Sequence, residues 1–129
     1  FSAVGFGFDL TKRGLQSQLK KKSLPWERAK SFDGSAVFSM FMPIEDISPS
    51  LSFTLSINGV VAQQGNLELM IHSPEKILKE IQSFMHLEDG DIVMTGTPKG
   101  VGVLESGDMY QVLIKNDQEI LLEQQWAAR

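Results

Sequence analysis

The clearest pattern along the chain is a strict alternation of hydrophobic and polar residues from Leu51 to Ile57. A period of two places successive side chains on opposite faces of a strand, so this stretch is predicted to be a β-strand with one buried face. Asn58-Gly59 follows directly, and this dipeptide is the strongest short signal for a hairpin turn. Residues 60–64 are therefore predicted to return as the second strand of an antiparallel hairpin.

Other short apolar runs are also typical of strands, because turn residues such as Asp89-Gly90 and Asn116-Asp117 interrupt them. In the first run bulky residues alternate with small ones, so the chain opens as a strand that is already under way. The predicted strands lie at residues 4–8, 37–43, 92–94 and 109–115, and the last is followed by a return strand at residues 119–126.

Two segments carry hydrophobic residues at the spacing of amphipathic helices. In residues 12–22, Leu15 and Leu19 lie one helical turn apart among Lys, Arg, Gln and Ser. Ser73-Pro74 has the form of an N-cap followed by proline at the first helical position, which predicts a second helix of about three turns. The apolar face of that helix comprises Ile77, Leu78, Ile81, Phe84 and Met85. The predicted fold class is α+β, rich in mixed β-sheet, with two or three short helices.

A glycine-rich loop at residues 95–102 has the composition of a ligand-binding loop. Its glycines let the backbone approach a ligand closely, and its threonines offer hydroxyl and amide groups. Pro98 stiffens the loop and favours an extended conformation at Thr97. A phosphate-binding P-loop is disfavoured because the order Gly-x4-Gly-Lys-Ser/Thr is absent. A sharp turn with a purely structural role is the remaining alternative.

Composition narrows the possible function classes. With 129 residues and 42% hydrophobic content, the chain is expected to form a single globular domain over residues 1–129. A net charge of −4 without a basic aromatic patch argues against nucleic-acid binding. Cysteine is absent, which excludes a disulfide framework and cysteine metal ligands. No apolar run approaches the ~20 residues that a membrane helix needs, so no membrane partner is expected.

Single side chains offer candidate chemistry, each with a structural alternative. Asp9 ends an apolar strand before a helix, where it could act as the helix N-cap or as an oxygen ligand for Mg²⁺ or Ca²⁺. Lys30 lies between small and aromatic neighbours, where a salt-bridged or snorkelling lysine is favoured. The run at residues 20–22 is interpreted as a solvated helix end. His72 and His86 flank a helix instead of sharing one of its faces, which disfavours a zinc site.

Three motifs, in this order, carry a resemblance to a known family. Residues 9–16 read Asp-Leu-Thr-Lys-Arg-Gly-Leu-Gln, residues 25–32 read Pro-Trp-Glu-Arg-Ala-Lys-Ser-Phe, and residues 95–102 read Thr-Gly-Thr-Pro-Lys-Gly-Val-Gly. Together they resemble the fumarylacetoacetate hydrolase family, and most closely its acylpyruvate hydrolase branch. The resemblance implies a β-roll or sandwich fold for essentially the whole chain.

The resemblance also implies roles for individual residues. Asp9 matches a carboxylate ligand of one Mg²⁺ or Mn²⁺, and Lys30 matches a catalytic lysine beside the metal and the substrate oxygens. Arg13 and Gln16 match polar residues that face the bound keto acid. Thr97, with Gly96 beside it, matches the loop position that holds the substrate carboxylate.

The implied reaction is hydrolysis of a C–C bond in an acylpyruvate or a similar small β-diketo acid, through a metal-stabilised enolate. An oxaloacetate-type decarboxylase, a hydroxymuconate-type isomerase of the same family, and an inactive ligand-binding or dimerisation module are the alternatives. The resemblance further implies a small keto-acid substrate, a homodimer, and a cytoplasmic location, or a mitochondrial one in a eukaryote.

The resemblance also predicts what the chain lacks. The Glu-x-Glu metal pair and the His-Glu pair that activates water precede the position of Asp9 in the family, and no residues here match them. The N-terminal part of the family domain is therefore expected to be missing, and these residues alone are expected to be inactive. Gly14 also departs from the family, because an acidic residue is common at its position.

Overall fold

The computed structural model describes all residues from Phe1 to Arg129. Its largest element is a four-stranded antiparallel sheet in the order β6-β5-β7-β8. The strands are β5 (Leu51–Ile57), β6 (Val60–Asn66), β7 (Met109–Asn116) and β8 (Glu119–Ala127). Both predicted strand pairs are therefore confirmed.

The turn between β5 and β6 shows why Asn58-Gly59 is a strong hairpin signal. Both residues have positive φ, 51° for Asn58 and 81° for Gly59, which asparagine and glycine tolerate better than other residues. Asn58 also joins the turn to β7, since its Oδ1 accepts from the backbone N–H of Met109 at 2.9 Å. The hairpin turn is thus tied to the neighbouring strand as well.

Four short strands form two small ladders beside the sheet. Strand β1 (Ala3–Val4) pairs with β4 (Met42–Pro43), and β2 (Gly7–Asp9) pairs with β3 (Ala36–Phe38). The single strands predicted at residues 4–8 and 37–43 are therefore each divided in two. Ser39 lies in the break between β3 and β4, and its hydroxyl accepts from the backbone N–H of Phe6 at 2.8 Å.

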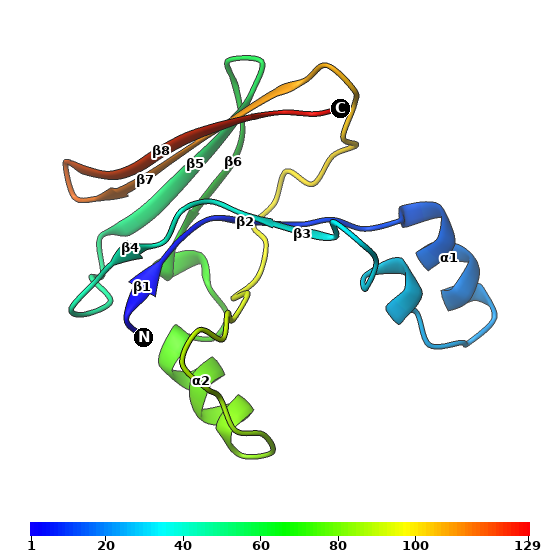
Figure 1. The fold of residues 1–129 in the computed structure, drawn as a ribbon, viewed down its shortest axis with the longest axis horizontal. Coiled ribbons are helices and arrows are strands. Elements are labelled where there is room, and N and C mark those ends of the chain that lie inside the picture. The colour runs from blue at the N-terminus through cyan, green and yellow to red at the C-terminus, as the bar shows by residue number, and fades with distance from the viewer.

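The helices are short and extend away from the sheet (Figure 1). Helix α1 (Arg13–Lys21) and the 3₁₀ turn η1 (Glu27–Ala29) form one arm, and α2 (Pro74–Gln82) forms a second. A further 3₁₀ turn, η2 (Leu67–Leu69), follows β6. The predicted cap of α2 is confirmed, since Ser73 Oγ accepts from the backbone N–H of Lys76. No helix is long and apolar enough to cross a membrane.

The core lies between the sheet and the opening strands. It is built from aromatic and branched side chains, and Val112 is fully buried at its centre. The six buried residues of the cluster are Phe6, Leu55, Tyr110, Val112, Ile114 and Leu122. The mixed α+β, sheet-rich architecture with two helices agrees with the predicted fold class.

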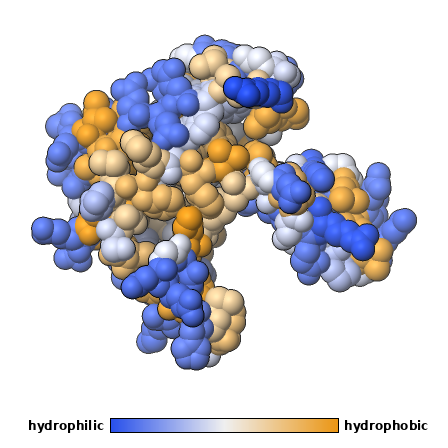
Figure 2. Space-filling view, in the orientation of Figure 1, coloured by the Kyte–Doolittle hydropathy of each residue, from blue (hydrophilic) through white to orange (hydrophobic).

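One predicted strand is wrong. Residues 92–94 are apolar, yet they pair with no other segment and have no regular secondary structure. A strand needs a hydrogen-bonding neighbour as well as apolar side chains, and no such neighbour faces this segment. The whole connection from α2 to β7 is irregular and exposes large hydrophobic side chains, including Phe84, Ile92 and Val103. Figure 2 shows apolar surface on the sheet body and on both arms.

Candidate active site

Asp9 and Lys30 form an ion pair where strand β2 leads into helix α1. The Lys30 ammonium also donates to Thr11 Oγ1 at 2.8 Å and approaches the Leu10 carbonyl at 3.4 Å. The side chains are 26% exposed for Lys30 and 43% exposed for Asp9. A fixed positive charge that solvent can still reach is well suited to meet an anionic substrate.

Asp9, Leu10, Thr11 and Lys30 form one polar cluster. Backbone hydrogen bonds hold its first segment, residues 9–11, against the segment that carries Lys30. The N–H of Leu10 donates to the Ser35 carbonyl at 2.8 Å, and the N–H of Lys12 donates to the Ala29 carbonyl at 3.0 Å. The turn η1 ends at Ala29, which is completely buried, and Lys30 follows directly. The Lys30 side chain therefore extends from a backbone position next to a buried residue.

The structure tests the structural alternatives for Asp9 and Lys30, namely a helix N-cap and a salt-bridged lysine. The N-cap position of α1 is Lys12, and no side chain caps the helix, so the N-cap interpretation of Asp9 is wrong. The carboxylate is engaged by Lys30 instead, which competes with a capping role. The prediction of a salt-bridged Lys30 is confirmed.

Arg13 and Gln16 form a second polar pair on the first turns of α1. The Arg13 guanidinium donates to Gln16 Oε1 at 2.9 Å. Gln16 is only 6% exposed, and it is the buried residue of this helix. Sequence periodicity placed Leu15 and Leu19 on the inner face, but both are only partly buried. The buried glutamine thus orients the guanidinium, a group suited to binding carboxylates.

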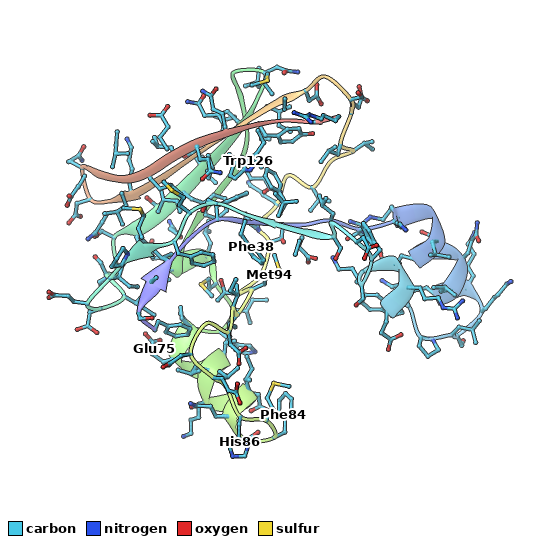
Figure 3. All side chains as sticks on the ribbon, viewed as in Figure 1. Phe38, Glu75, Phe84, His86, Met94 and Trp126 are labelled. Carbon is cyan, nitrogen blue, oxygen red and sulfur yellow. The ribbon has the colours of Figure 1, made fainter.

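Gly96 and Thr97 lie on the exposed loop, away from direct contact with this cluster. No hydrogen bond joins either residue to Asp9, Arg13 or Lys30. The loop passes close to β6, since a Cβ on Gly100 would lie 2.1 Å from the Ala62 carbonyl oxygen. Just before the loop, Met94 lies near β2, since a Cβ on Gly7 would lie 3.2 Å from the Met94 methyl. Figure 3 shows Met94 beside Phe38, between the sheet and α2.

The residues present do not by themselves fit the metal site that the family resemblance implies. Asp9 supplies one carboxylate, and no group of three or more His, Asp or Glu side chains could hold a metal ion. His72 and His86 are both exposed, and His86 lies near the tip of the α2 arm (Figure 3).

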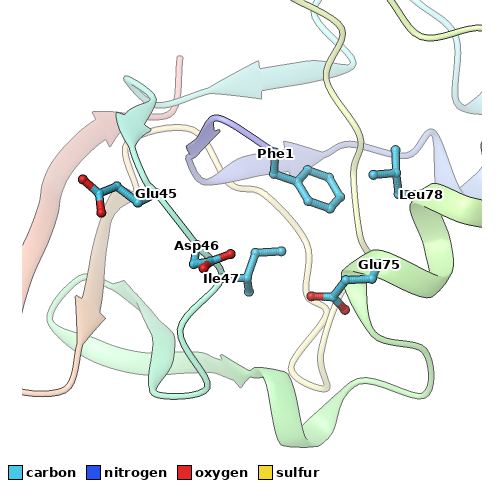
Figure 4. Close-up of a pocket in the computed structure, with 6 residues that line it drawn as sticks. All are labelled: Phe1, Glu45, Asp46, Ile47, Glu75 and Leu78. Atoms are coloured by element: carbon cyan, nitrogen blue, oxygen red, sulfur yellow. The ribbon is translucent and has the colours of Figure 1, made fainter.

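Two hollows in the surface lie apart from the predicted residues. One, of about 220 Å³, is lined by apolar and acidic side chains between the opening strand and α2, as Figure 4 shows. Its lining residues are Phe1, Glu45, Asp46, Ile47, Glu75 and Leu78. The other, of about 150 Å³, is lined by hydrophobic residues, including Phe8, Leu10 and Tyr110. Burial raises the pKa of the Tyr110 hydroxyl, and the Asp108 carboxylate raises it further.

The sequence analysis assigned no role to Thr11, although its spacing from Asp9 indicates that the two side chains could share a partner. Side chains two residues apart in extended backbone point to the same side, so a threonine two positions after a strand-end aspartate faces the same partner. The contact with the Leu10 carbonyl could not be predicted from the sequence, because every residue has a backbone carbonyl.

Comparison with known proteins gives consistent matches. The chain is 42% identical over 114 residues to an oxaloacetate tautomerase of Escherichia coli, covering 86% of this chain and 52% of that protein. It is 44% identical over 105 residues to the mitochondrial oxaloacetate tautomerase of Bos taurus, covering 80% and 48%. The chain thus spans about half the length of the curated relatives it matches.

Solved structures match over nearly the whole chain. A yeast fumarylacetoacetate hydrolase family protein superposes with a TM-score of 0.90 at 33% identity, covering 99% of this chain and 56% of that one. The fumarylpyruvate hydrolase of Pseudomonas aeruginosa, solved with Mn²⁺ and pyruvate, gives 0.82 at 30% identity, covering 98% and 53%. The family model described as fumarylacetoacetate hydrolase C-terminal matches residues 4–124. This chain belongs to the fumarylacetoacetate hydrolase family.

Proposed function

We propose that the protein carrying these residues interconverts the enol and keto forms of oxaloacetate or a closely similar small 2-oxo acid. The observation that carries the proposal is the Lys30 ammonium, held by Asp9 and Thr11, in a chain that aligns with oxaloacetate tautomerases. This proposal replaces C–C bond hydrolysis, the first expectation from the sequence, with a reaction closer to the isomerase alternative.

The chemistry requires a positive charge near an oxygen that becomes negative. Tautomerisation removes a proton from the enol hydroxyl and delivers a proton to the adjacent carbon, so negative charge passes through the 2-oxo oxygen. A preorganised ammonium beside that oxygen stabilises the charge more than water does. Lys30 is the cation that we assign to this role.

The other site residues are proposed to bind the substrate. Arg13, oriented by Gln16 at 2.9 Å, would take one carboxylate through paired N–H groups. Thr97 and the adjacent Gly96 would hold the second carboxylate from the loop, which requires the loop and α1 to face one ligand. Gly96 has φ of 121°, a conformation suited to glycine, so its backbone is free of a side chain on the ligand side.

A divalent cation, Mg²⁺ or Mn²⁺, is part of the proposal, since the fumarylpyruvate hydrolase was solved with Mn²⁺. When bound, it would supply further positive charge at the substrate oxygens. Asp9 would be one of its ligands, and the remaining ligands are not gathered by these residues. We also propose that the protein forms a homodimer. Its proposed location is the cytoplasm or, in a eukaryote, the mitochondrion, since the bovine relative is named as a mitochondrial protein.

The second candidate is hydrolysis of an acylpyruvate, favoured by the match to fumarylpyruvate hydrolase. Two assays on the complete natural protein separate the candidates. Decay of the ultraviolet absorbance of enol-oxaloacetate measures tautomerisation, and release of pyruvate from an acylpyruvate measures hydrolysis. We expect kcat/KM for tautomerisation to exceed that for hydrolysis by about tenfold or more. The reverse ratio would assign the hydrolase, and neither activity would reject both.

A further inference from the structure

Thr11 has a single side-chain partner, and that partner is Lys30. Its Oγ1 accepts from the ammonium at 2.8 Å, and it does not cap α1, whose N-cap position is Lys12. The geometry points to Thr11 as a positioning residue that acts through Lys30, an inference that rests on the proposed function. Thr11 would fix the direction of the ammonium without touching the substrate.

The number of acceptors around Lys30 supports this role. An ammonium has three N–H donors, and three consecutive residues supply the acceptors: the Asp9 carboxylate, the Leu10 carbonyl and the Thr11 hydroxyl. All three therefore converge from one side of the lysine. Without Thr11, the ammonium would retain one charged partner and one distant carbonyl, and it could rotate about the ion pair.

The backbone on either side of Thr11 is fixed to the segment that carries Lys30. The preceding residue donates its N–H to Ser35, and the following residue donates its N–H to Ala29, at 2.8 Å and 3.0 Å. The hydroxyl is therefore presented from a rigid position. A threonine in a mobile loop would hold the lysine less well, because the loop itself would lose conformational entropy on forming the contact.

The three acceptors are not equivalent, and the difference indicates how Lys30 would meet a substrate. The Leu10 carbonyl is 3.4 Å away, at the limit of a hydrogen bond, whereas Thr11 lies at 2.8 Å. The N–H that points at the Leu10 carbonyl is therefore the one that can most easily donate to a substrate oxygen instead. The other two N–H groups of Lys30 stay hydrogen-bonded to Asp9 and Thr11 during this change of partner. No proton leaves the lysine.

Thr11→Val removes the hydroxyl and keeps the branched shape, whereas Thr11→Ser keeps the hydroxyl. Thr54→Val, on strand β5, is the matched control, since it makes the same change away from the cluster. The first measurement is the NMR signal of the Lys30 ammonium in the complete natural protein labelled with ¹⁵N-lysine, assigned with Lys30→Arg. Such protons are visible when hydrogen bonds slow their exchange with water.

We expect the Lys30 signal to broaden or disappear in Thr11→Val and to persist in Thr11→Ser and Thr54→Val. With enol-oxaloacetate, Thr11→Val should lower kcat by about tenfold and change KM less than about twofold, because one hydrogen bond to a charged group is lost. Thr11→Ser should recover most of kcat. A Thr11→Val protein with an unchanged ammonium signal and kcat would overturn the inference.

Failure of the proposed function is recognised separately. If the unchanged protein does not act on enol-oxaloacetate, the proposed function fails, while the ammonium signal still decides whether Thr11 positions Lys30. Circular dichroism checks the fold of each variant, and Thr11→Ala replaces Thr11→Val if the latter unfolds. Unfolding of both would assign Thr11 a structural role and would also overturn the inference.

Discussion

Asp9 and Lys30 are separated by 21 positions in the sequence and form the one ion pair of the structure. The pair joins the end of strand β2 to the residue after turn η1, so two distant motifs meet at one point. An exposed pair of this kind contributes little to stability. Its position, together with the additional acceptors at Leu10 and Thr11, is the reason that we propose a functional role for the ammonium.

Metal binding tests whether Asp9 can act alone. Because one ion-paired carboxylate does not make a cation site, we expect the 129-residue chain to bind Mg²⁺ or Mn²⁺ more weakly than about 1 mM in calorimetry. Turnover by this chain alone is expected to be absent as well. Tight binding that Asp9→Ala abolishes and Asp33→Ala preserves would contradict the prediction.

Gly14 offers a stabilising substitution. It lies within α1, and a Cβ placed on it meets nothing within 4 Å. Glycine in a helix interior costs about 0.5–1 kcal/mol relative to alanine. Because Gly14 is the second residue of α1, Gly14→Ala should raise the free energy of unfolding by up to that amount in urea titrations. Gly59→Ala is the opposite control: φ there is 81°, and the change should cost about 1 kcal/mol. If both substitutions changed the free energy of unfolding in the same direction, the prediction would be contradicted.

Val112 tests the location of the core. Its side chain is completely buried, whereas Val61 is 54% exposed. We expect Val112→Ala to lower the free energy of unfolding by about 2 kcal/mol, because a cavity replaces packed methyl groups. Val61→Ala should change it by less than about 0.5 kcal/mol. Similar losses for both valines, measured by denaturant unfolding, would show that the core lies elsewhere.

Glu75 tests the cap of α2 through its pH dependence. The hydrogen bond from Ser73 is the main reason that the pKa of the Glu75 carboxyl lies below its ordinary value of 4.5. A lowered folded-state pKa gives stability that is present above the unfolded pKa and is lost as pH falls through the folded value. Ser73→Ala should therefore raise the pKa of Glu75 toward 4.5 in an NMR titration. Ser83→Ala, at the other end of α2, should leave it unchanged; equal shifts would contradict the assignment.

The sequence predicted the parts of the fold that local patterns determine. Period-two alternation and Asn58-Gly59 are local signals, and they sufficed for the β5–β6 hairpin. The Ser73-Pro74 cap was predicted for the same reason. Each of these features depends on residues within a few positions of one another.

Features that depend on distant partners were not predictable in this way. The break after β3 is held partly by Met40, whose N–H donates to Gln124 Oε1, 84 positions away. Residues 92–94 read as a strand, but the sequence could not reveal that no neighbouring strand would face them.

The candidate site shows the same division. The family motifs pointed to Asp9 and Lys30 as candidates, whereas the contact with Thr11 and the burial of Gln16 became apparent only in the structure. Helical periodicity predicts leucines on the inner face of α1. The buried side chain there is instead Gln16, which accepts a hydrogen bond from Arg13.

The most direct test of the proposed function is the effect of Lys30→Met on the decay of enol-oxaloacetate by the complete natural protein. Methionine keeps much of the length of the side chain and removes its charge. Lys79→Met, on the exposed side of α2, is the matched control. We expect kcat to fall by about 100-fold or more for Lys30→Met and to stay within about twofold for Lys79→Met. A folded Lys30→Met protein with unchanged kcat would contradict the assignment of Lys30 as the cation that stabilises the enolate.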